Sequence, residues 1–320
     1  MLKMSLIQLS SLIGRAVTRR FNPNGHSGVL YFHRVLEKPD PYYPDDPTVE
    51  ELDKLLTVLK RTFRIVSLKE IAETREVGSG NKPLIGISFD DGYLDNYTLA
   101  RPLLDKHGIK ATFFVSTVGT REGILWQDKL IECVKRCEGN TATFGVGNAL
   151  EGLTEKGIVN YLMEHMKRLD VGNRDRQLIK WSLELGGVPY PELMMNDSQV
   201  KALSDDGHDI GAHTHNHVIL SSESKVRVEK EITENRDYLE RITGKKIDLF
   251  CYPNGHPLHD LDVSVHPKML NRLGFRFAFT TLDGGISKDN DAMLLPRFLP
   301  YRRNPYLRTW SSAKIAGEVV

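Results

Sequence analysis

Short apolar runs alternate with helical patterns along most of this sequence. Helical patterns at 49–60 and 96–107 each stand between two such runs. Strands that alternate with helices in this way typically pair in parallel, so the pattern predicts an α/β fold built on a parallel sheet or barrel. The predicted core strands outside the motifs described below are 28–35, 65–66, 110–115, 247–251, 275–280 and 294–299, the last two closing the sheet.

Residues 121–196 interrupt this alternation. They carry helical patterns at 127–137, 155–168 and 174–185 but few strand signals. We therefore expect one barrel domain over 25–320 that holds a mostly helical insertion at 121–196. Barrel proteins commonly vary their specificity through such strand-to-helix connections, so the insertion either shapes a substrate cleft or is a spacer without a role in binding.

The first residues form a separate pattern. Within 1–24, apolar residues recur at helical spacing among basic ones, and the apolar run is too short and too polar to span a bilayer. No small-residue cleavage site follows, so a cleaved signal peptide is not expected. Two interpretations stay open: a helix packed on the domain, or a basic amphipathic helix at 1–22 that lies on a membrane surface.

Charge and cysteine content narrow the partners and the compartment. The chain has 43 Lys and Arg against 42 Asp and Glu, which gives no electrostatic reason to expect a nucleic-acid partner. Three cysteines, Cys133, Cys137 and Cys251, cannot make a disulfide framework. We interpret them as reduced thiols and expect a cytoplasmic, or membrane-associated cytoplasmic, location.

The apolar run Leu84 to Phe89 ends abruptly in Asp90, Asp91 and Gly92. The run has the length of a buried strand, and the glycine indicates a turn after it. Buried charge without a partner is strongly disfavoured, so two carboxylates at this point are expected to meet a cation or a metal, or to have shifted pKa values.

A second short strand, beginning at Asp209, runs into the cluster His213, His215 and His217. His213 and His217 are four residues apart and would share a face if the chain turned helically there. Two imidazoles and one carboxylate are a common zinc-binding set that leaves a coordination position open. Together with Asp90 and Asp91 the cluster predicts a metal site, at which His215 is either a supporting or lining residue or a plain surface one.

These two stretches resemble a known family. Residues 88–92, Ser-Phe-Asp-Asp-Gly, and residues 213–217, His-Thr-x-x-His, are similar to motifs of the polysaccharide deacetylases, the NodB-homology group or carbohydrate esterase family 4. The resemblance covers about 28–300 and implies a distorted (β/α)7-type barrel. By motif matching it implies that Asp90 is the general base, and that Asp91, His213 and His217 hold one divalent metal ion. That ion is expected to be zinc, with iron, cobalt or nickel as substitutes.

The sequence departs from the family pattern at residues 250–255, Phe-Cys-Tyr-Pro-Asn-Gly. Cys251 stands where the family usually has an arginine that supports the base. Arg297 is the candidate replacement; the alternative is that Arg297 is a surface residue of a closing strand. Asn254 is expected to contribute its backbone N–H to an oxyanion hole, because that atom does not depend on the side chain.

The family usually has a final Leu-x-His motif, and here no histidine follows His266. His33 ends the first predicted strand and resembles that final histidine, as in family members whose motif order is circularly permuted. The first and last strands of a closed barrel are neighbours, so the relocation is geometrically reasonable. We expect His33 to be the general acid; the alternative is a histidine that is hydrogen-bonded at a strand end.

The resemblance implies metal-dependent removal of N-acetyl groups from amino sugars of a polysaccharide or its lipid-linked precursor, as in exopolysaccharide biosynthesis. An O-acetyl esterase is a second hypothesis, because the same groups attack esters. A barrel that binds acetylated glycan without turnover is a third. Retention of both carboxylates and both histidines argues against that third class, whereas Cys251 leaves it open.

Overall fold

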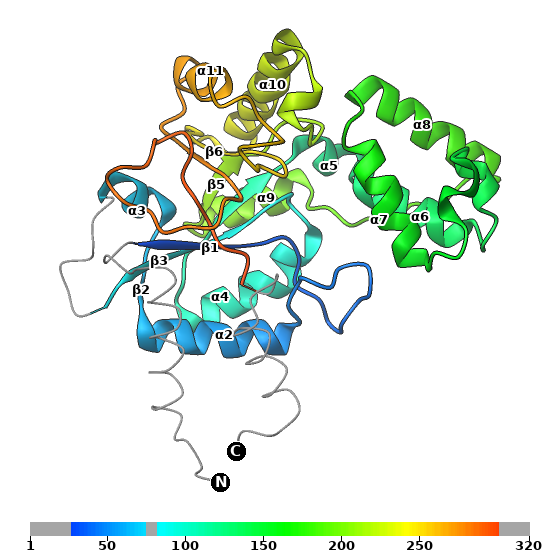
Figure 1. Ribbon diagram of the computed structural model, residues 1–320. Coiled ribbons are helices and arrows are strands. Elements are labelled where there is room, and N and C mark those ends of the chain that lie inside the picture. The colour runs from blue at the N-terminus through cyan, green and yellow to red at the C-terminus, as the bar shows by residue number, and fades with distance from the viewer. Residues whose placement is uncertain (1–26, 75–81, 301–320) are drawn as a thin grey trace.

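The computed structural model describes residues 27–74 and 82–300 (Figure 1). The helix expected at 1–24, with its proposed membrane contact at 1–22, lies outside these residues. Within the described ranges, every helix is too short or too polar to cross a membrane. The cytoplasmic location stays an expectation from the sequence.

A curled sheet of parallel strands forms the centre of the molecule (Figure 1). Its strand order is β1-β3-β4-β5-β6-β7, and β2 pairs with β3 beside this path. Every pairing between these strands is parallel, so their carboxyl ends lie at one edge. The strands are β1 Gly28–Phe32, β2 Arg64–Ile65, β3 Leu84–Phe89, β4 Thr112–Val115, β5 Asp209–Ala212, β6 Leu249–Cys251 and β7 Phe277–Phe279.

An extended segment at 294–298 connects the two outer strands of the sheet. The Leu295 N–H donates to a β7 carbonyl (2.9 Å), and the Phe298 N–H donates to a β1 carbonyl (2.8 Å). The segment bridges to both strands but forms no continuous ladder, unlike the predicted closing strand at 294–299. Pro296 lies between the two bridges and has no N–H to donate.

The predicted α/β barrel with its helical insertion is confirmed.

Aromatic rings from opposite strands meet inside the barrel. The rings of Phe114 on β4 and Phe279 on β7 lie 5.8 Å apart, although β5 and β6 separate these strands in the sheet. The contact therefore crosses the interior. Alternate residues point to the other face, where Phe32, Ile87, Phe113 and others pack against the surrounding helices.

Outside the insertion, a series of helical segments surrounds or connects the strands. The predicted helix at 96–107 begins as a π-helical turn, and Pro102, which lacks an N–H, stands at the junction with the α-helix. A capping box formed by Thr48 and Glu51 begins α2. The segments are α2 Val49–Thr62, α3 Leu68–Thr74, η1 Asn96–Ala100, α4 Arg101–His107, α5 Thr117–Glu122, α9 Asp197–Asp205, α10 Lys225–Thr243 and α11 His266–Arg272.

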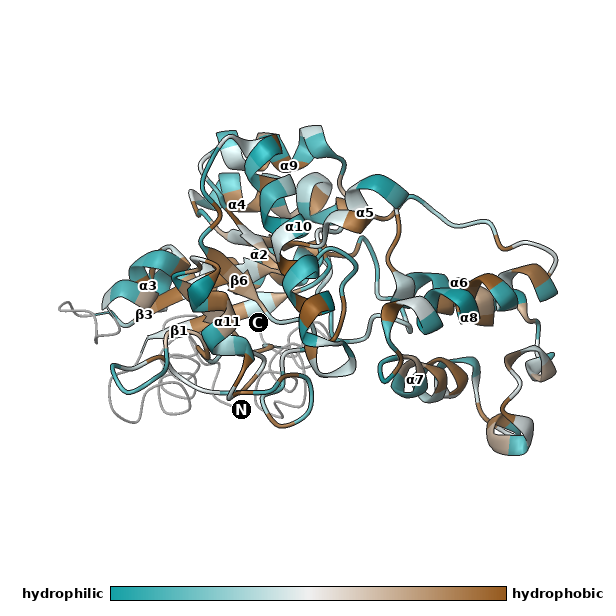
Figure 2. Cartoon of the chain, turned by 90° about the horizontal axis from the view of Figure 1, so that it is seen from above, coloured by the Kyte–Doolittle hydropathy of each residue, from teal (hydrophilic) through white to brown (hydrophobic). Residues whose placement is uncertain are grey.

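The insertion between β4 and β5 contains α6 Trp126–Arg136, α7 Glu155–Met166 and α8 Val171–Glu184. Two 3-10 turns, Thr141–Phe144 and Gly147–Leu150, join α6 to α7, and a further one, Leu220–Ser222, follows β5. The three helices stand together beside the barrel, and their apolar residues face one another (Figure 2). They therefore share a hydrophobic core of their own, which includes Trp181 and Phe144.

Candidate active site

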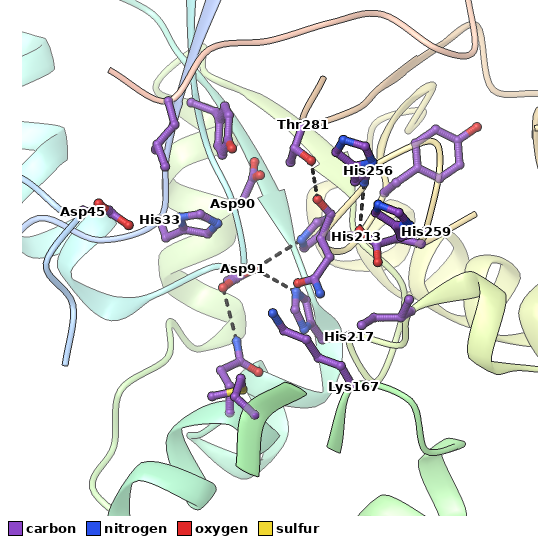
Figure 3. A pocket seen from close by; sticks show the side chains of 18 of the residues that line it. His33, Asp45, Asp90, Asp91, Lys167, His213, His217, His256, His259 and Thr281 are labelled. Carbon is purple, nitrogen blue, oxygen red and sulfur yellow. Dashed lines mark hydrogen bonds and ion pairs between the residues drawn. The ribbon is translucent and has the colours of Figure 1, made fainter. Parts of the chain in front are cut away.

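A cavity of about 1260 Å³ opens at the carboxyl ends of the strands. Its walls come from the loops after β1, β3, β5 and β6 and from helices of the insertion (Figure 3). Six of the seven predicted site residues line it; Arg297, the seventh, is buried directly beneath. The six are His33, Asp90, Asp91, His213, Asn254 and His217.

Asp91 lies between the two predicted imidazole ligands. Its Oδ1 atom is 3.2 Å from His213 Nε2 and 3.1 Å from His217 Nε2, and all three side chains are buried. Burial raises the pKa of Asp91, but the neighbouring imidazoles of His217 and His213 outweigh it and hold that pKa well below its usual value. The three ligand atoms could thus meet a single ion.

Two observations bear on whether these residues fit a metal. The buried Asp91 Oδ1 has no hydrogen-bond partner among the described residues, which leaves its lone pairs free. The Nδ1 atom of His213 lies 2.7 Å from the Cys251 carbonyl, so this nitrogen donates its proton there and Nε2 is the ring nitrogen that faces Asp91. Two imidazole nitrogens and one carboxylate oxygen are a donor set that suits zinc and similar divalent ions. The residues fit such an ion.

The backbone around these residues is strained. Asp91, Thr214, His217 and Asn254 have φ values of 77°, 59°, 49° and 56°, in the left-handed region that non-glycine residues rarely adopt. Residues 213–217 form no helical turn, so the condition under which their spacing would place the two histidines on one face does not hold. The imidazoles converge, with ring centroids 5.0 Å apart, because the chain makes left-handed turns between them.

Arg297 meets Asp90 through a two-pronged ion pair. Its Nη1 and Nη2 atoms donate to Asp90 Oδ1 and Oδ2 at 2.9 and 2.8 Å. The guanidinium also donates to the Ser88 hydroxyl and the Thr280 carbonyl, and it is fully buried. The alternative that Arg297 is a surface residue is therefore wrong. Burial raises the pKa of Asp90, but Arg297 outweighs it, so that pKa lies below its usual value.

Cys251 lies beside this ion pair. Its Sγ atom is 2.8 Å from Arg297 Nη2, and its thiol donates to Asp90 Oδ2 at 3.5 Å. Burial raises the pKa of Cys251, so the group is a thiol and not a thiolate. An arginine from the closing segment thus reaches the carboxylate past the small side chain of Cys251.

His33 and Asn254 complete the predicted set. Figure 3 shows His33 and His213 on opposite sides of Asp90. The His33 ring lies edge-on to Tyr31, with 5.7 Å between the ring centroids. The Asn254 carbonyl accepts a hydrogen bond from the Thr281 hydroxyl (2.6 Å), which fixes the left-handed turn at this residue.

His215 takes no part in the cavity wall. Its ring nitrogen Nδ1 lies 2.7 Å from the Thr117 hydroxyl, and its backbone N–H donates to the Glu231 carbonyl. Of the roles considered from the sequence, lining the site is therefore wrong for His215.

The structure adds a polar network that the sequence did not reveal. The Arg34 guanidinium lies between the rings of Tyr43 and Tyr93, at 4.5 and 4.8 Å from their centroids, and pairs with Asp95. Both tyrosine hydroxyls donate to Asp128 in the insertion, and burial raises the pKa of Asp128 to about 6. These residues come from three distant segments, namely the loop after β1, the turn after β3 and helix α6, so no local pattern connects them.

The fold and the site together define a parallel (β/α) barrel with a carboxylate and imidazole centre at the carboxyl ends of its strands. The model of the polysaccharide deacetylase family matches residues 78–146 and 158–278, more than half of the chain. The protein belongs to the polysaccharide deacetylase family, as the sequence motifs predicted. His33 and Arg297 lie outside the matched ranges.

One curated relative and two solved structures are also similar to this chain. YxkH of Bacillus subtilis (strain 168) is 29% identical over 133 residues, which are 40% of this chain and 43% of YxkH, so this chain covers less than half of that relative's length. The deacetylase PplD of Streptococcus pyogenes, in complex with acetate, is 18% identical, with a TM-score of 0.57 over 89% of this chain and 97% of PplD. IcaB from Ammonifex degensii is 18% identical, with a TM-score of 0.56 over 89% of this chain and 96% of IcaB. At these identities the two structures show the fold alone.

Proposed function

We propose that the protein is a metal-dependent deacetylase that removes N-acetyl groups from amino sugars of a polysaccharide or its glycolipid precursor. The observation that carries this proposal is the convergence of Asp91, His213 and His217 beside the Asp90–Arg297 pair in one cavity. Pockets for small molecules typically hold about 300–1000 Å³, so a cavity of 1260 Å³ suits a glycan longer than a single sugar.

Asp91, His213 and His217 would hold the divalent ion, zinc or in its place iron, cobalt or nickel. When bound, such an ion supplies Lewis-acid chemistry, since it polarises the acetyl carbonyl and makes water more acidic. The remaining groups of the site then have to move two protons and hold one developing negative charge.

Asp90 is the proposed general base. Its carboxylate is ionised because Arg297 holds its pKa low, and the two-pronged bond fixes its orientation. Asp90 takes a proton from the attacking water as the water oxygen bonds to the acetyl carbon. Arg297 is a positioning residue in this account, because it contacts Asp90 and lines no part of the cavity.

His33 and Asn254 act on the two other atoms of the amide. The Asn254 N–H donates to the carbonyl oxygen as negative charge develops on it, a contribution worth about 3 kcal/mol per donor in known cases. His33 gives a proton to the sugar nitrogen as the C–N bond breaks. The products are acetate and the free amino sugar.

Acetate release from an N-acetylated amino-sugar oligosaccharide tests this proposal. The purified protein with added Zn²⁺ should release acetate, and the Asp90→Asn variant, as a matched control, should not. Release from an O-acetylated glycan alone would replace the proposal by the esterase hypothesis. Glycan binding without release from either substrate would favour a non-catalytic barrel.

A further inference from the structure

Two side chains of the insertion bind the turn that carries the second imidazole. The Trp126 Nε1–H donates to the His217 carbonyl at 3.3 Å. Arg174 donates from Nη1 to the same carbonyl at 3.4 Å and from Nη2 to the Asn216 carbonyl at 2.9 Å. These bonds join α6 and α8 to a barrel loop that lies more than forty residues away in the sequence.

A third side chain of the insertion binds the carboxylate. Gln127 Nε2 donates to Asp91 Oδ2 at 3.3 Å and lies 3.5 Å from the Tyr93 hydroxyl. This bond engages the carboxylate oxygen that does not face the imidazoles. The insertion therefore contacts two of the three residues proposed to hold the ion.

Arg174 is unusual among the arginines of the insertion because it is only 4% exposed. The nearest carboxylate oxygen among the described residues belongs to Asp175, at 3.6 Å from Nε, and the Asp175 side chain is half-exposed. The guanidinium instead lies over the Trp126 ring, 4.8 Å from its centroid. Burying a cation whose ion-pair partner is a half-exposed carboxylate at 3.6 Å is unfavourable. An apolar side chain at this position would therefore stabilise the packing of the insertion better than an arginine does.

The turn at His217 needs such donors. His217 has a φ of 49°, and its carbonyl lies outside any helix or strand ladder. On the opposite side, Glu231 of α10 accepts a hydrogen bond from the Asn216 N–H at 2.7 Å. The strained turn is thus fixed between α10 and the insertion, and Trp126 and Arg174 supply the bonds on the insertion's side.

We infer that Trp126, Gln127 and Arg174 are positioning residues for the metal site. They hold the Asp91 carboxylate and the His217 turn in the arrangement that an ion requires. This inference rests on the proposed function, because it presumes that Asp91 and His217 are ligands. Replacing residues that support ligands typically weakens metal affinity about 10–100-fold.

The test is the affinity of the purified full-length protein for Zn²⁺ and Co²⁺, measured by competition with a chelator. Arg174→Met removes the donors and keeps the length of the side chain, so it should raise the Zn²⁺ Kd about 10–100-fold. Arg174→Lys keeps the charge and should recover part of the loss. Trp126→Phe keeps the ring and removes one bond, so it should raise the Kd less than Arg174→Met does.

Trp181→Phe is the matched control. Trp181 lies in the core of the same insertion, and its Nε1 atom has no hydrogen-bond partner among the described residues. This variant should lower the Tm of the metal-free protein as Trp126→Phe does, because both alter buried rings. Its Zn²⁺ Kd should equal that of the wild-type protein, which separates positioning of the site from stability of the insertion.

Arg174→Met and Trp126→Phe proteins that bind Zn²⁺ as tightly as the wild type would overturn the inference and leave the proposed function intact. A wild-type protein that binds neither ion would overturn the proposed function, and this inference with it. If Arg174→Met does not fold, Trp126→Phe and Gln127→Leu decide the question, and an unchanged Kd in both overturns the inference.

Discussion

Replacing Arg297 by methionine removes the cation that faces the buried Asp90 carboxylate. The two groups share bonds of 2.9 and 2.8 Å, and Arg297 is fully buried. Two unit charges about 4 Å apart attract by roughly 4 kcal/mol at an effective dielectric constant of about 20. Breaking a buried pair by removing one partner costs about 3–5 kcal/mol, because the other charge is left uncompensated. We therefore expect Arg297→Met to lower the free energy of unfolding by about 3–5 kcal/mol.

Urea unfolding of the metal-free protein measures this change. A bound ion would add its own binding free energy to the apparent stability, so the metal is first removed with a chelator. Tryptophan fluorescence and far-UV circular dichroism should give coincident transitions, which justifies a two-state free energy. Arg276→Met is the control, because the Arg276 side chain is exposed and its ion pairs with Glu73 and Asp248 should contribute much less than a fully buried pair.

A double variant separates the free energy of the ion pair from the free energy lost through poorer packing. Combining Arg297→Met with Asp90→Asn removes both charges, so the double variant should be more stable than the sum of the single effects predicts. The coupling free energy should be about 2–3 kcal/mol, the upper part of the range for groups in direct contact. An Arg297→Met protein as stable as Arg276→Met, or a coupling near zero, would refute the argument from burial.

Three predictions concern the reaction. The wild-type protein should carry about one divalent ion per chain, and Asp91→Asn, His213→Ala or His217→Ala should strip it, since losing a ligand sharply weakens such a site; full occupancy in all three, by elemental analysis, would contradict the assignment. Asp90→Asn should abolish acetate release yet keep the metal, and loss of the metal would mean that the roles of Asp90 and Asp91 are reversed. His33→Ala should keep the metal and lose most amide turnover but less turnover of an aryl acetate, whose leaving group needs no proton; equal losses on both substrates would argue against an acid role.

Several features of the fold and site could be predicted because they are local in the sequence. Asp90 and Asp91 end an apolar run that must be buried as a strand, and His213 follows another such run. Parallel strands present their carboxyl ends at one edge of the sheet, so the order of the elements already brings these residues together. The roles of these residues were inferred from their resemblance to the family motifs.

The exact backbone conformation of two segments was harder to predict, because a single residue can prevent the strand or helix that the surrounding hydrophobic pattern favours. Pro296 prevents a regular ladder at the closing segment, although the residues around it have the pattern of a strand. Thr214 and His217 both adopt left-handed conformations, and a β-branched residue such as Thr214 rarely has a positive φ. The four-residue spacing of the two histidines therefore did not indicate the backbone conformation between them.

The sequence by itself determined the barrel class, the acidic and histidine motifs and the absence of the usual arginine at Cys251. Only the tertiary structure decided that Arg297 reaches Asp90 across 207 residues of chain, and that Trp126 and Arg174 contact the His217 turn. The physical reason is that a strand or a turn is encoded by neighbouring residues. A long-range pair, in contrast, depends on how the closing segment meets β1 and how the insertion packs beside the barrel, and neither leaves a periodic trace in the sequence.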